Sequence, residues 1–332
     1  MRSAVFSGDS RVEVREVPDP RPGTGEVLLR IHASALCGSE LKHYRSGQGR
    51  ALNAGHEIAA EVIEANAAGI HQPGDHVVVN IMAAHTCGRC YFCLSGDPKY
   101  CKQAQNVWGA HCELIAADAR ACLPLPADIA FETGALLGGD FVGTSYRAVK
   151  RLGVGGLDTV MVIGAGPVGL GVLGILRFMG ARVIVVEPTR YRRDLAAAVG
   201  ATVLDPNDVD VQATAVELTS GLGPHVVIDC AGRPETQNLA LDTVRIKGKV
   251  GFVGENQQLT INPSKQIIHK ELTIVGSVYY TPEDYQEILL LYRQGYRPEQ
   301  FVTHRFPLAE ADQAFRTFAS GESGKVLLTY GP

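Results

Sequence analysis

The 332-residue chain contains no run of about 18 apolar residues, so no membrane-spanning helix is expected. Its N-terminal stretch, MRSAVFSGDSRVEV, is polar, lacks the apolar core of a secretory signal and is predicted to form a strand. Basic residues are not in excess: 31 Lys and Arg face 35 Asp and Glu. The resulting net charge of −4 gives no reason to expect nucleic acid or a membrane as partner. No internal repeat or low-complexity tract is evident.

Cysteine, by contrast, is concentrated in one short stretch. Cys87, Cys90, Cys93 and Cys101 fall in the run CGRCYFCLSGDPKYC, where two CxxC steps share their middle cysteine. Four thiolates suit a tetrahedral structural zinc, which would order a segment that has no core of its own. The alternatives are two disulfides or four unrelated thiols, but disulfides require an oxidising compartment. We therefore predict a structural zinc lobe over 87–101 and a cytoplasmic protein.

The chain divides into two regions of different pattern, as its length suggests. Up to about residue 135, short strands alternate with loops rich in glycine and proline, which predicts a β-rich domain. From about residue 142, apolar strands alternate with helices, which predicts an α/β domain with a doubly wound parallel sheet. The predicted strands are 12–17, 27–32, 57–64 and 76–79, then 159–163, 182–187, 202–204, 226–230, 249–253 and 272–275. The last fifty or so residues are predicted to form helices over 282–294 and 309–318 and strands over 302–306 and 324–329.

A glycine-rich turn, GAGPVG, directly follows the strand TVMVI. Gly164 allows a tight turn, Gly166 lets the backbone approach a pyrophosphate, and Gly169 lets helix and strand pack closely. The helix N-terminus at Pro167 and Val168 would direct its free N–H groups at the phosphates. The order of strand, turn and helix predicts a dinucleotide site.

An acidic residue, Glu187, closes the next strand, where it would accept hydrogen bonds from the adenosine ribose and repel a 2′-phosphate. This favours NAD over NADP. Arg190, Arg192 and Arg193 follow closely and leave NADP open, because they form either an exposed helix start or a phosphate clamp, or stack on adenine. We take Arg192 as a cofactor contact.

Three further residues gain meaning only together: Cys37 in LCGSELKHY, His56 in AGHE and Asp140 in LLGGDFVGTSY. With the cysteine run, the GAGPVG turn and the segment KELTIVGS, they resemble the zinc-dependent medium-chain alcohol dehydrogenases over nearly the whole chain. The resemblance implies a β-rich GroES-like catalytic domain, a Rossmann domain and a C-terminal segment that returns to the first domain; the boundaries are 1–141, 142–281 and 282–332.

The resemblance makes Cys37, His56 and Asp140 the ligands of a catalytic zinc, the second zinc per subunit, with Glu57 beside it as an outer or alternate ligand. Three protein ligands leave a fourth position for water or substrate. Zinc in such a site lowers the pKa of an alcohol, whose hydride passes to the nicotinamide. The segment DFVGTSY matches the aspartate version found in secondary-alcohol dehydrogenases.

The resemblance also implies a proton relay that begins at Ser39, two residues after Cys37. Many relatives carry histidine five residues after that cysteine, where this chain has Lys42 and then His43. We favour His43 as the terminal base because its ordinary pKa suits the task; Lys42 or a water molecule is the alternative. A second departure, Ala60 in place of the last glycine of GHExxG, touches no ligand.

The sequence thus predicts a zinc oxidoreductase that moves hydride between NAD(H) and a secondary alcohol or polyol and its ketone. The alternatives are an NADP-linked aldehyde or ketone reductase of the same family, a zinc-free quinone or enone reductase, and a non-catalytic zinc-stabilised protein. Polyols, amino alcohols, cyclitols and simple secondary alcohols all remain possible substrates. The segment 275–280 resembles the one through which relatives pair, which implies a homodimer or homotetramer through the cofactor domain. The pocket candidates, each equally compatible with core packing, are Trp108, Phe141, Tyr44 and His111.

Overall fold

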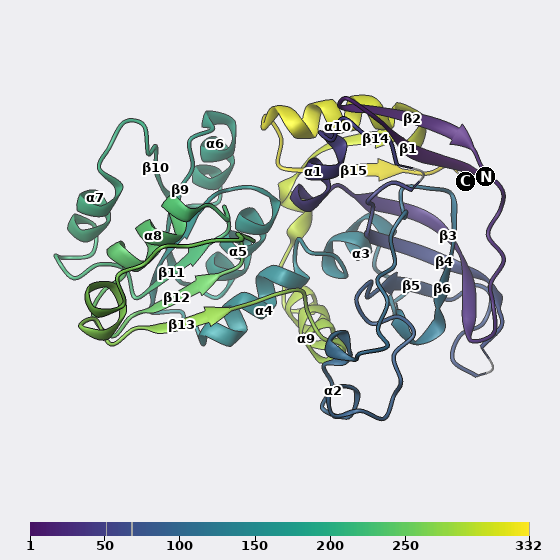
Figure 1. The fold of residues 1–332 in the computed structure, drawn as a ribbon, viewed down its shortest axis with the longest axis horizontal. Coiled ribbons are helices and arrows are strands. Elements are labelled where there is room, and N and C mark those ends of the chain that lie inside the picture. Colours follow the sequence, from purple (N-terminus) through teal and green to yellow (C-terminus); the bar gives the residue numbers. More distant parts are fainter. Residues whose placement is uncertain (51, 68, 332) are drawn as a thin grey trace. The chain divides into compact units, whose positions relative to one another are not determined.

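The computed structural model describes residues 1–50, 52–67 and 69–331. The chain forms two compact units, drawn in Figure 1. The first unit joins the two ends of the sequence, Met1–Gly143 and Tyr280–Pro332, and the second is the continuous stretch Thr144–Tyr279. Among the described residues, no helix is long and apolar enough to cross a membrane.

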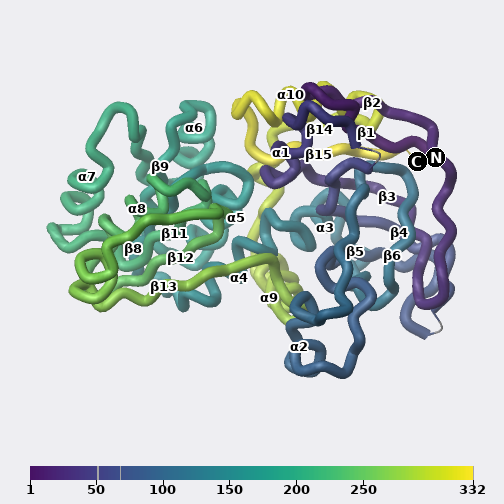
Figure 2. The backbone as a smooth tube through the Cα atoms, viewed as in Figure 1, coloured from purple at the N-terminus to yellow at the C-terminus, as the bar shows by residue number. Residues whose placement is uncertain are grey.

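The first unit is built on a seven-stranded sheet. The strand order is β14, β15, β3, β4, β5, β7, and β6 pairs with β3 outside this path. The bounds are β3 Glu26–Ala35, β4 Glu57–Ala65, β5 His76–Val79, β6 Leu114–Asp118, β7 Cys122–Pro124, β14 Val302–Pro307 and β15 Lys325–Thr329. Since Leu328 of β15 pairs antiparallel with Ser34 of β3, the C-terminal segment completes the N-terminal sheet, as the yellow and purple traces of Figure 2 show.

The N-terminal stretch differs from its prediction as a single strand, because it folds into a hairpin of β1 (Arg2–Gly8) and β2 (Arg11–Glu16). The turn residues Asp9 and Ser10 have φ angles of 51° and 58°. Two successive left-handed residues form the tight turn whose twist matches a β-hairpin. Phe6 of β1 packs edge-on against Phe315 of helix α10 (Ala311–Ser320), so this hairpin covers part of the core.

Helix starts in the first unit follow from local sequence. α9 (Pro282–Arg293) begins with a capping box between Thr281 and Asp284 and has proline in its first turn. α3 (Phe131–Leu137) is a short helix that was not predicted from the sequence, and it packs on β3 and β4. The remaining short helices of this unit are α1 (Leu41–Tyr44) and α2 (Tyr91–Leu94).

The second unit is a six-stranded parallel sheet in the order β10, β9, β8, β11, β12, β13. Its strands are β8 Thr159–Ile163, β9 Arg182–Val186, β10 Thr202–Leu204, β11 Val226–Asp229, β12 Lys249–Phe252 and β13 Thr273–Gly276. All six lie within a residue or two of the predicted strands, because short buried apolar runs bounded by turns are a strong strand signal. The strand order reverses between β8 and β11, which is where such sheets bind nucleotides.

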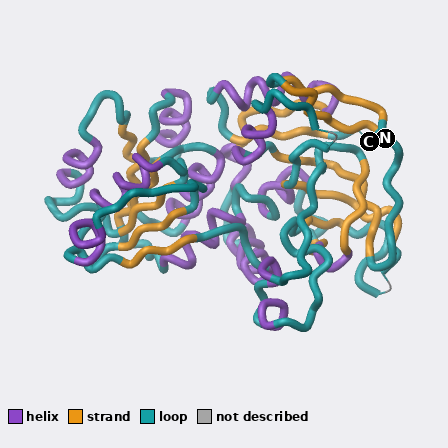
Figure 3. The backbone as a smooth tube through the Cα atoms, viewed as in Figure 1, coloured by secondary structure: helices purple, strands orange, loops and turns teal. Residues whose placement is uncertain are grey.

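Helices cover both faces of this parallel sheet, as the purple and orange segments of Figure 3 show. Met161 and Ile163 share one core cluster with side chains of α7 and α8, while the alternate residues Val160 and Val162 are equally buried on the opposite face. The helices are α4 Gly143–Leu152, α5 Pro167–Phe178, α6 Arg190–Ala198, α7 Val211–Glu217 and α8 Pro234–Thr243. Burial on both faces is why these strands are apolar without alternation.

Candidate metal and cofactor sites

Four side chains from three separate stretches converge in the first unit. The ligand atoms of Cys37, His56, Glu57 and Asp140 all lie within 4.8 Å of one another. His56 Nε2 is 3.0 Å and Cys37 Sγ is 3.4 Å from Asp140 Oδ2. The sheet brings the first two together, because Ala35 at the end of β3 pairs with Glu57 at the start of β4. Asp140 lies in the turn that follows α3.

The protonation pattern of this cluster fits a bound cation. His56 Nδ1 is 2.8 Å from the carbonyl oxygen of Ala54, which can only accept, so Nδ1 carries a proton and Nε2 is the ring nitrogen that faces Asp140. Burial, and then the charge of Asp140, raises the pKa of the Cys37 thiol. A thiolate, an imidazole lone pair and a carboxylate repel one another unless a proton or cation lies among them. Sulfur, nitrogen and oxygen donors suit a catalytic zinc.

Glu57, the fourth member, is held by a lysine from the other end of the chain. Its Oε1 accepts a 2.6 Å hydrogen bond from Lys325 Nζ, which also donates to the carbonyl oxygen of Leu36. Both side chains are fully buried. A Cβ on Gly139 would lie 2.4 Å from Glu57 Oε2, so only glycine lets the turn before Asp140 approach this carboxylate. Glu57 therefore supports the turn that carries Asp140.

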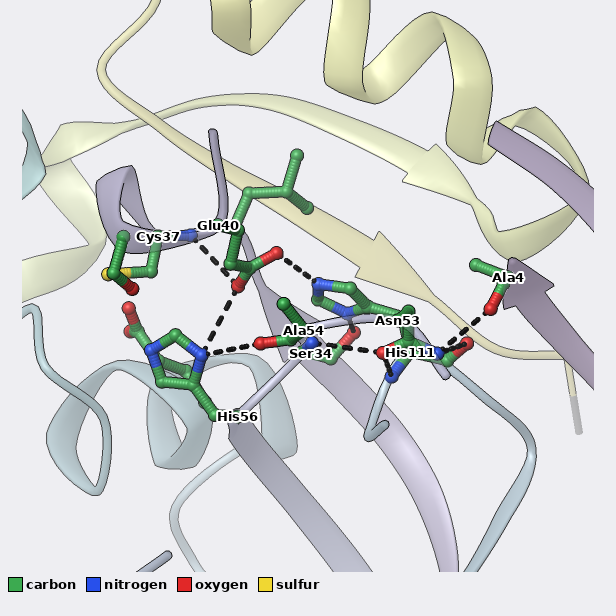
Figure 4. Close-up of polar contacts among 12 residues, drawn as sticks. Ala4, Ser34, Cys37, Glu40, Asn53, Ala54, His56 and His111 are labelled. Atoms are coloured by element: carbon green, nitrogen blue, oxygen red, sulfur yellow. Dashed lines mark hydrogen bonds and ion pairs between the residues drawn. The ribbon is translucent and has the colours of Figure 1, made fainter. Parts of the chain in front are cut away.

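A second buried pair, Glu40 and His111, lies behind the cluster (Figure 4). Glu40 Oε1 accepts from the backbone N–H of Cys37 at 3.2 Å and is 3.5 Å from His56 Nδ1, while Oε2 is 2.9 Å from His111 Nε2. Burial opposes ionisation of Glu40, yet the attraction of His111 keeps its pKa below the usual value. Glu40 was not predicted as a site residue, and His111, a predicted pocket candidate, is completely buried in the interior.

The four-cysteine run folds back on itself. The sulfur atoms of Cys87, Cys90, Cys93 and Cys101 lie within 4.8 Å of one another, and each is a free thiol. Backbone N–H groups of Cys87 and Gln103 point at the sulfur of Cys101 and lower its pKa to about 6, which favours a thiolate at neutral pH. The side chains between them include exposed Tyr91 and Leu94. The lobe has the donor set of a structural zinc and little apolar burial to replace it.

In the second unit, the glycine turn follows β8 as predicted. Gly164 has a φ of 92°, and a Cβ on Gly169 would lie 1.8 Å from the carbonyl oxygen of Gly164, so helix α5 packs directly on the turn. A Cβ on Gly166 would meet no protein atom within 4 Å. Open space at Gly166 is what the approach of a ligand to the backbone requires.

Glu187 reaches back from the end of β9 to this turn. It is buried, its Oε2 accepts from the backbone N–H of Ala165 at 2.7 Å, and its Oε1 accepts from Thr189 at 2.9 Å. The carboxylate therefore lies against the glycine turn, the place where an adenosine ribose binds in such folds.

The comparisons with known proteins agree with these sites. The family model "Alcohol dehydrogenase GroES-like domain" matches residues 23–127, and "Zinc-binding dehydrogenase" matches residues 167–293. A zinc-type alcohol dehydrogenase-like protein of Escherichia coli (strain K12) is 31% identical over 356 residues, 99% of each chain. Human sorbitol dehydrogenase is 30% identical over 348 residues, 99% of this chain and 96% of the relative.

The chain belongs to the zinc-type alcohol dehydrogenase family. Among solved structures, alcohol dehydrogenase TADH from Thermus sp. ATN1 matches with a TM-score of 0.91 at 28% identity and covers 100% of both chains. Galactitol-1-phosphate dehydrogenase from Escherichia coli matches with a TM-score of 0.88 at 26% identity, over 99% and 100% of the two chains. The resemblance read from the sequence is confirmed, and so is the fold class of a Rossmann domain plus a GroES-like domain. The protein is an oxidoreductase of the alcohol dehydrogenase class.

Of the two predicted relay residues, Ser39 contacts a member of the cluster, and His43 contacts Arg50. Ser39 is exposed and its hydroxyl donates to Cys37 Sγ at 3.3 Å. His43 Nδ1 is 2.5 Å from Arg50 Nη1. Because a guanidinium only donates, His43 Nδ1 accepts from Arg50. Partial burial, followed by the positive charges of Arg50 and Lys42, lowers the pKa of His43 and favours its neutral imidazole.

The other sequence candidates separate into core and surface. Tyr44 and Phe141 are buried core residues, whereas Trp108 is 45% exposed with its ring edge-on to His56 at 5.3 Å. Trp108 is thus the aromatic candidate that borders both the cluster and solvent.

The three arginines that follow β9 also differ from one another. Arg193 forms a 2.6 Å ion pair with Asp205 and donates to two backbone carbonyls, so its contacts are structural. Arg190 is largely exposed. Arg192 is partly buried, which lowers its pKa, and the negative charge of Glu187 partly offsets this effect.

Proposed function

We propose that this protein transfers hydride between NAD(H) and a secondary alcohol or polyol, with a catalytic zinc held by Cys37, His56 and Asp140. The convergence of these ligand atoms within 4.8 Å supports the proposal most directly. Two curated relatives at 30% identity carry the names sorbitol dehydrogenase and L-threonine 3-dehydrogenase. Sorbitol and threonine share a secondary hydroxyl next to another polar substituent, so we infer a substrate of that kind. A zinc-free quinone or enone reductase would have no use for these three ligands.

The chain's own residues define what the site does to a substrate. A zinc ion bound there would act as a Lewis acid toward the hydroxyl or carbonyl oxygen. His56 is oriented by its Nδ1–H bond to Ala54, and Asp140 by the turn that rests on Glu57. Trp108 offers an apolar wall beside His56 for the carbon chain of the substrate.

Proton movement is assigned to Ser39 and His43. The Ser39 hydroxyl, 3.3 Å from Cys37 Sγ and open to solvent, accepts the proton that an alcohol loses and releases its own. The neutral imidazole of His43 is the terminal acceptor, since nearby cations disfavour its protonated form at rest. Lys42 or a water molecule is the competing candidate for this role.

The cofactor is assigned to the glycine turn of the second unit. The pyrophosphate would lie on the turn formed by Gly164, Gly166 and Gly169. The backbone N–H groups in the first turn of α5, from Val168 onward, would donate hydrogen bonds to it. Glu187 would accept from the ribose hydroxyls, which selects NAD over NADP, and Arg192 would contact the adenosine side. A second, structural zinc in the 87–101 lobe completes the metal content.

We also propose that the subunits associate through the second unit. β13 is an edge strand of the parallel sheet and leaves Ile274 and the following Val278 more than a third exposed. Pairing of two such edges about a twofold axis would cover them and give a dimer, or a tetramer built from dimers. Eight free thiols suit the reducing cytoplasm that we propose as its compartment.

The decisive experiment combines metal analysis with turnover. Secondary alcohols and polyols are screened with NAD and NADP by the absorbance of the reduced nicotinamide. Asp140→Ala is expected to abolish turnover and to lower the zinc content from two ions to one, while circular dichroism stays unchanged. Asp128→Ala, which removes an exposed carboxylate paired with Arg293, serves as the matched control and should retain both ions and turnover. Near-normal turnover of Asp140→Ala would refute the ligand assignment.

A further inference from the structure

The pair of Glu40 and His111 is buried completely, although neither residue faces solvent or is expected to touch a substrate. Because a carboxylate oxygen only accepts, His111 Nε2 donates to Glu40 Oε2. The other ring nitrogen is 2.8 Å from Ser34 Oγ, which is in turn 2.8 Å from the hydroxyl of Tyr330. Both nitrogens of His111 are therefore engaged, and the ring cannot turn without loss of a buried hydrogen bond.

The backbone around His111 is also tied to the segment that carries His56 (Figure 4). The side-chain oxygen of Asn53 accepts from the backbone N–H groups of both Gly55 and His111, at 2.9 and 3.0 Å. Its amide nitrogen donates to the carbonyl oxygens of Ala4, Gly109 and His111. A Cβ on Gly55 would lie 2.6 Å from His111 Cγ, so the imidazole packs closely against the chain just before His56.

Glu40 links His111 to the proposed zinc ligands, because its carboxylate contacts both Cys37 and His56. Oε1 accepts from the backbone N–H of Cys37 and lies 3.5 Å from His56 Nδ1, on the side of the imidazole opposite the cluster. A fixed negative charge beside Nδ1–H increases the basicity of Nε2, and hydrogen-bonded partners of metal ligands set ligand orientation. Without the donor on His111, Oε2 would be a buried carboxylate oxygen with an unmet hydrogen bond and would reorient toward another donor.

We propose that His111 is a positioning residue for the catalytic zinc. Through its hydrogen bond to Oε2, it holds the Glu40 carboxylate where the other oxygen fixes the Cys37 backbone and faces the His56 imidazole. The proposal rests on the proposed function, since it requires that Cys37, His56 and Asp140 bind zinc. It assigns the strength and geometry of metal binding partly to a residue that contacts neither metal nor substrate.

The test is the affinity of each zinc site in the full-length holoprotein. Zinc transfer to a chromogenic chelator is followed over time, and Asp140→Ala identifies which phase belongs to the catalytic ion. His111→Phe keeps a flat ring over Gly55 but removes the donor to Glu40. We expect it to weaken catalytic zinc binding about 10–100-fold, the range found for partners of metal ligands, and to leave the zinc of the four-cysteine lobe unchanged. Cobalt substituted at the catalytic site should show an altered thiolate-to-cobalt absorption band.

A second variant and a control keep the test decisive. Glu40→Gln preserves size and removes the charge, and it should weaken the same ion by a similar factor. Tyr330→Phe removes a hydroxyl from the far end of the same network and should leave both ions as they are. Unchanged catalytic zinc affinity in either folded variant, or an equal loss in Tyr330→Phe, would overturn the positioning role. Zinc content that is the same in the unmodified protein and in Asp140→Ala would instead overturn the proposed function.

Discussion

Lys325→Met is expected to destabilise the first unit severely, although it changes one methylene-rich side chain for another. Lys325 and Glu57 have no exposed side-chain surface, and Nζ supplies donors to Glu57 Oε1 and to the carbonyl oxygen of Leu36. The variant leaves a carboxylate in the interior without its cation. Removal of one partner of a buried ion pair costs about 3–5 kcal/mol of unfolding free energy, because the remaining charge stays desolvated.

That magnitude is large enough to measure by urea unfolding. With a denaturant slope of about 2 kcal/mol/M, a loss of about 4 kcal/mol lowers the midpoint by about 2 M. The measurement follows circular dichroism in saturating zinc, so that metal loading is equal in all variants. Arg305→Met on β14 is the matched control: its pair with Glu132 is partly exposed on both sides, and its loss should cost about 1 kcal/mol or less.

A double variant separates lost charge from lost packing. In Lys325→Met combined with Glu57→Gln, the interior carries no uncompensated charge, so this protein should be more stable than Lys325→Met alone. The reasoning would be refuted if Lys325→Met shifted the midpoint no more than Arg305→Met. It would also be refuted if the double variant were the less stable of the two.

Three further outcomes are expected. Cys87→Ser should lose one zinc ion and lower the urea midpoint, because metal binding supplies the lobe's folding energy, whereas Cys112→Ala outside the lobe should keep both ions; an unchanged zinc count would contradict the lobe. Glu187→Gln should raise NADP use relative to NAD in kcat/KM, since the charge that repels a 2′-phosphate is gone; an unchanged ratio would count against the ribose contact. Arg50→Gln should raise the pKa of His43 by removing a neighbouring positive charge, so the acidic limb of the kcat/KM profile for alcohol oxidation moves to higher pH. An unmoved limb would exclude His43 as the base.

The second unit was the more predictable part of the fold. Its strands are short apolar runs between turns, as in TVMVI, and the glycine turn lies where strand, turn and helix follow in order. α3 was missed because FETGALL is too short for a clear helical period and is followed by two glycines. Its stability comes from packing on the sheet, which no local pattern records.

The metal cluster was predictable only through the family resemblance, because its ligands come from three distant stretches. Of the residues that support the cluster, Glu57 was predicted beside the metal, whereas the supporting roles of Glu40, His111 and Lys325 were not predicted. Glu40 and His111 are 71 positions apart, and only the register of β3 with its neighbours brings them together. Lys325 could have been noticed in the sequence, because it is a single charged residue at the start of the apolar strand KVLLT. A buried charge of this kind predicts a buried counter-charge. A pattern of this kind says that a partner exists but not which residue it is.

The pairing of β15 with β3 has a consequence for biosynthesis. The second unit takes all its strands from one uninterrupted stretch and can fold as it leaves the ribosome, ahead of the residues that follow it. The pocket around Glu57, in contrast, is complete only when Lys325 has been synthesised, because Glu57 pairs with this residue 268 positions further along the chain. A nascent or truncated polypeptide that lacks the last strand would therefore carry a finished second unit but an unfinished pocket around Glu57, and capture of the proposed catalytic ion becomes one of the closing events of maturation.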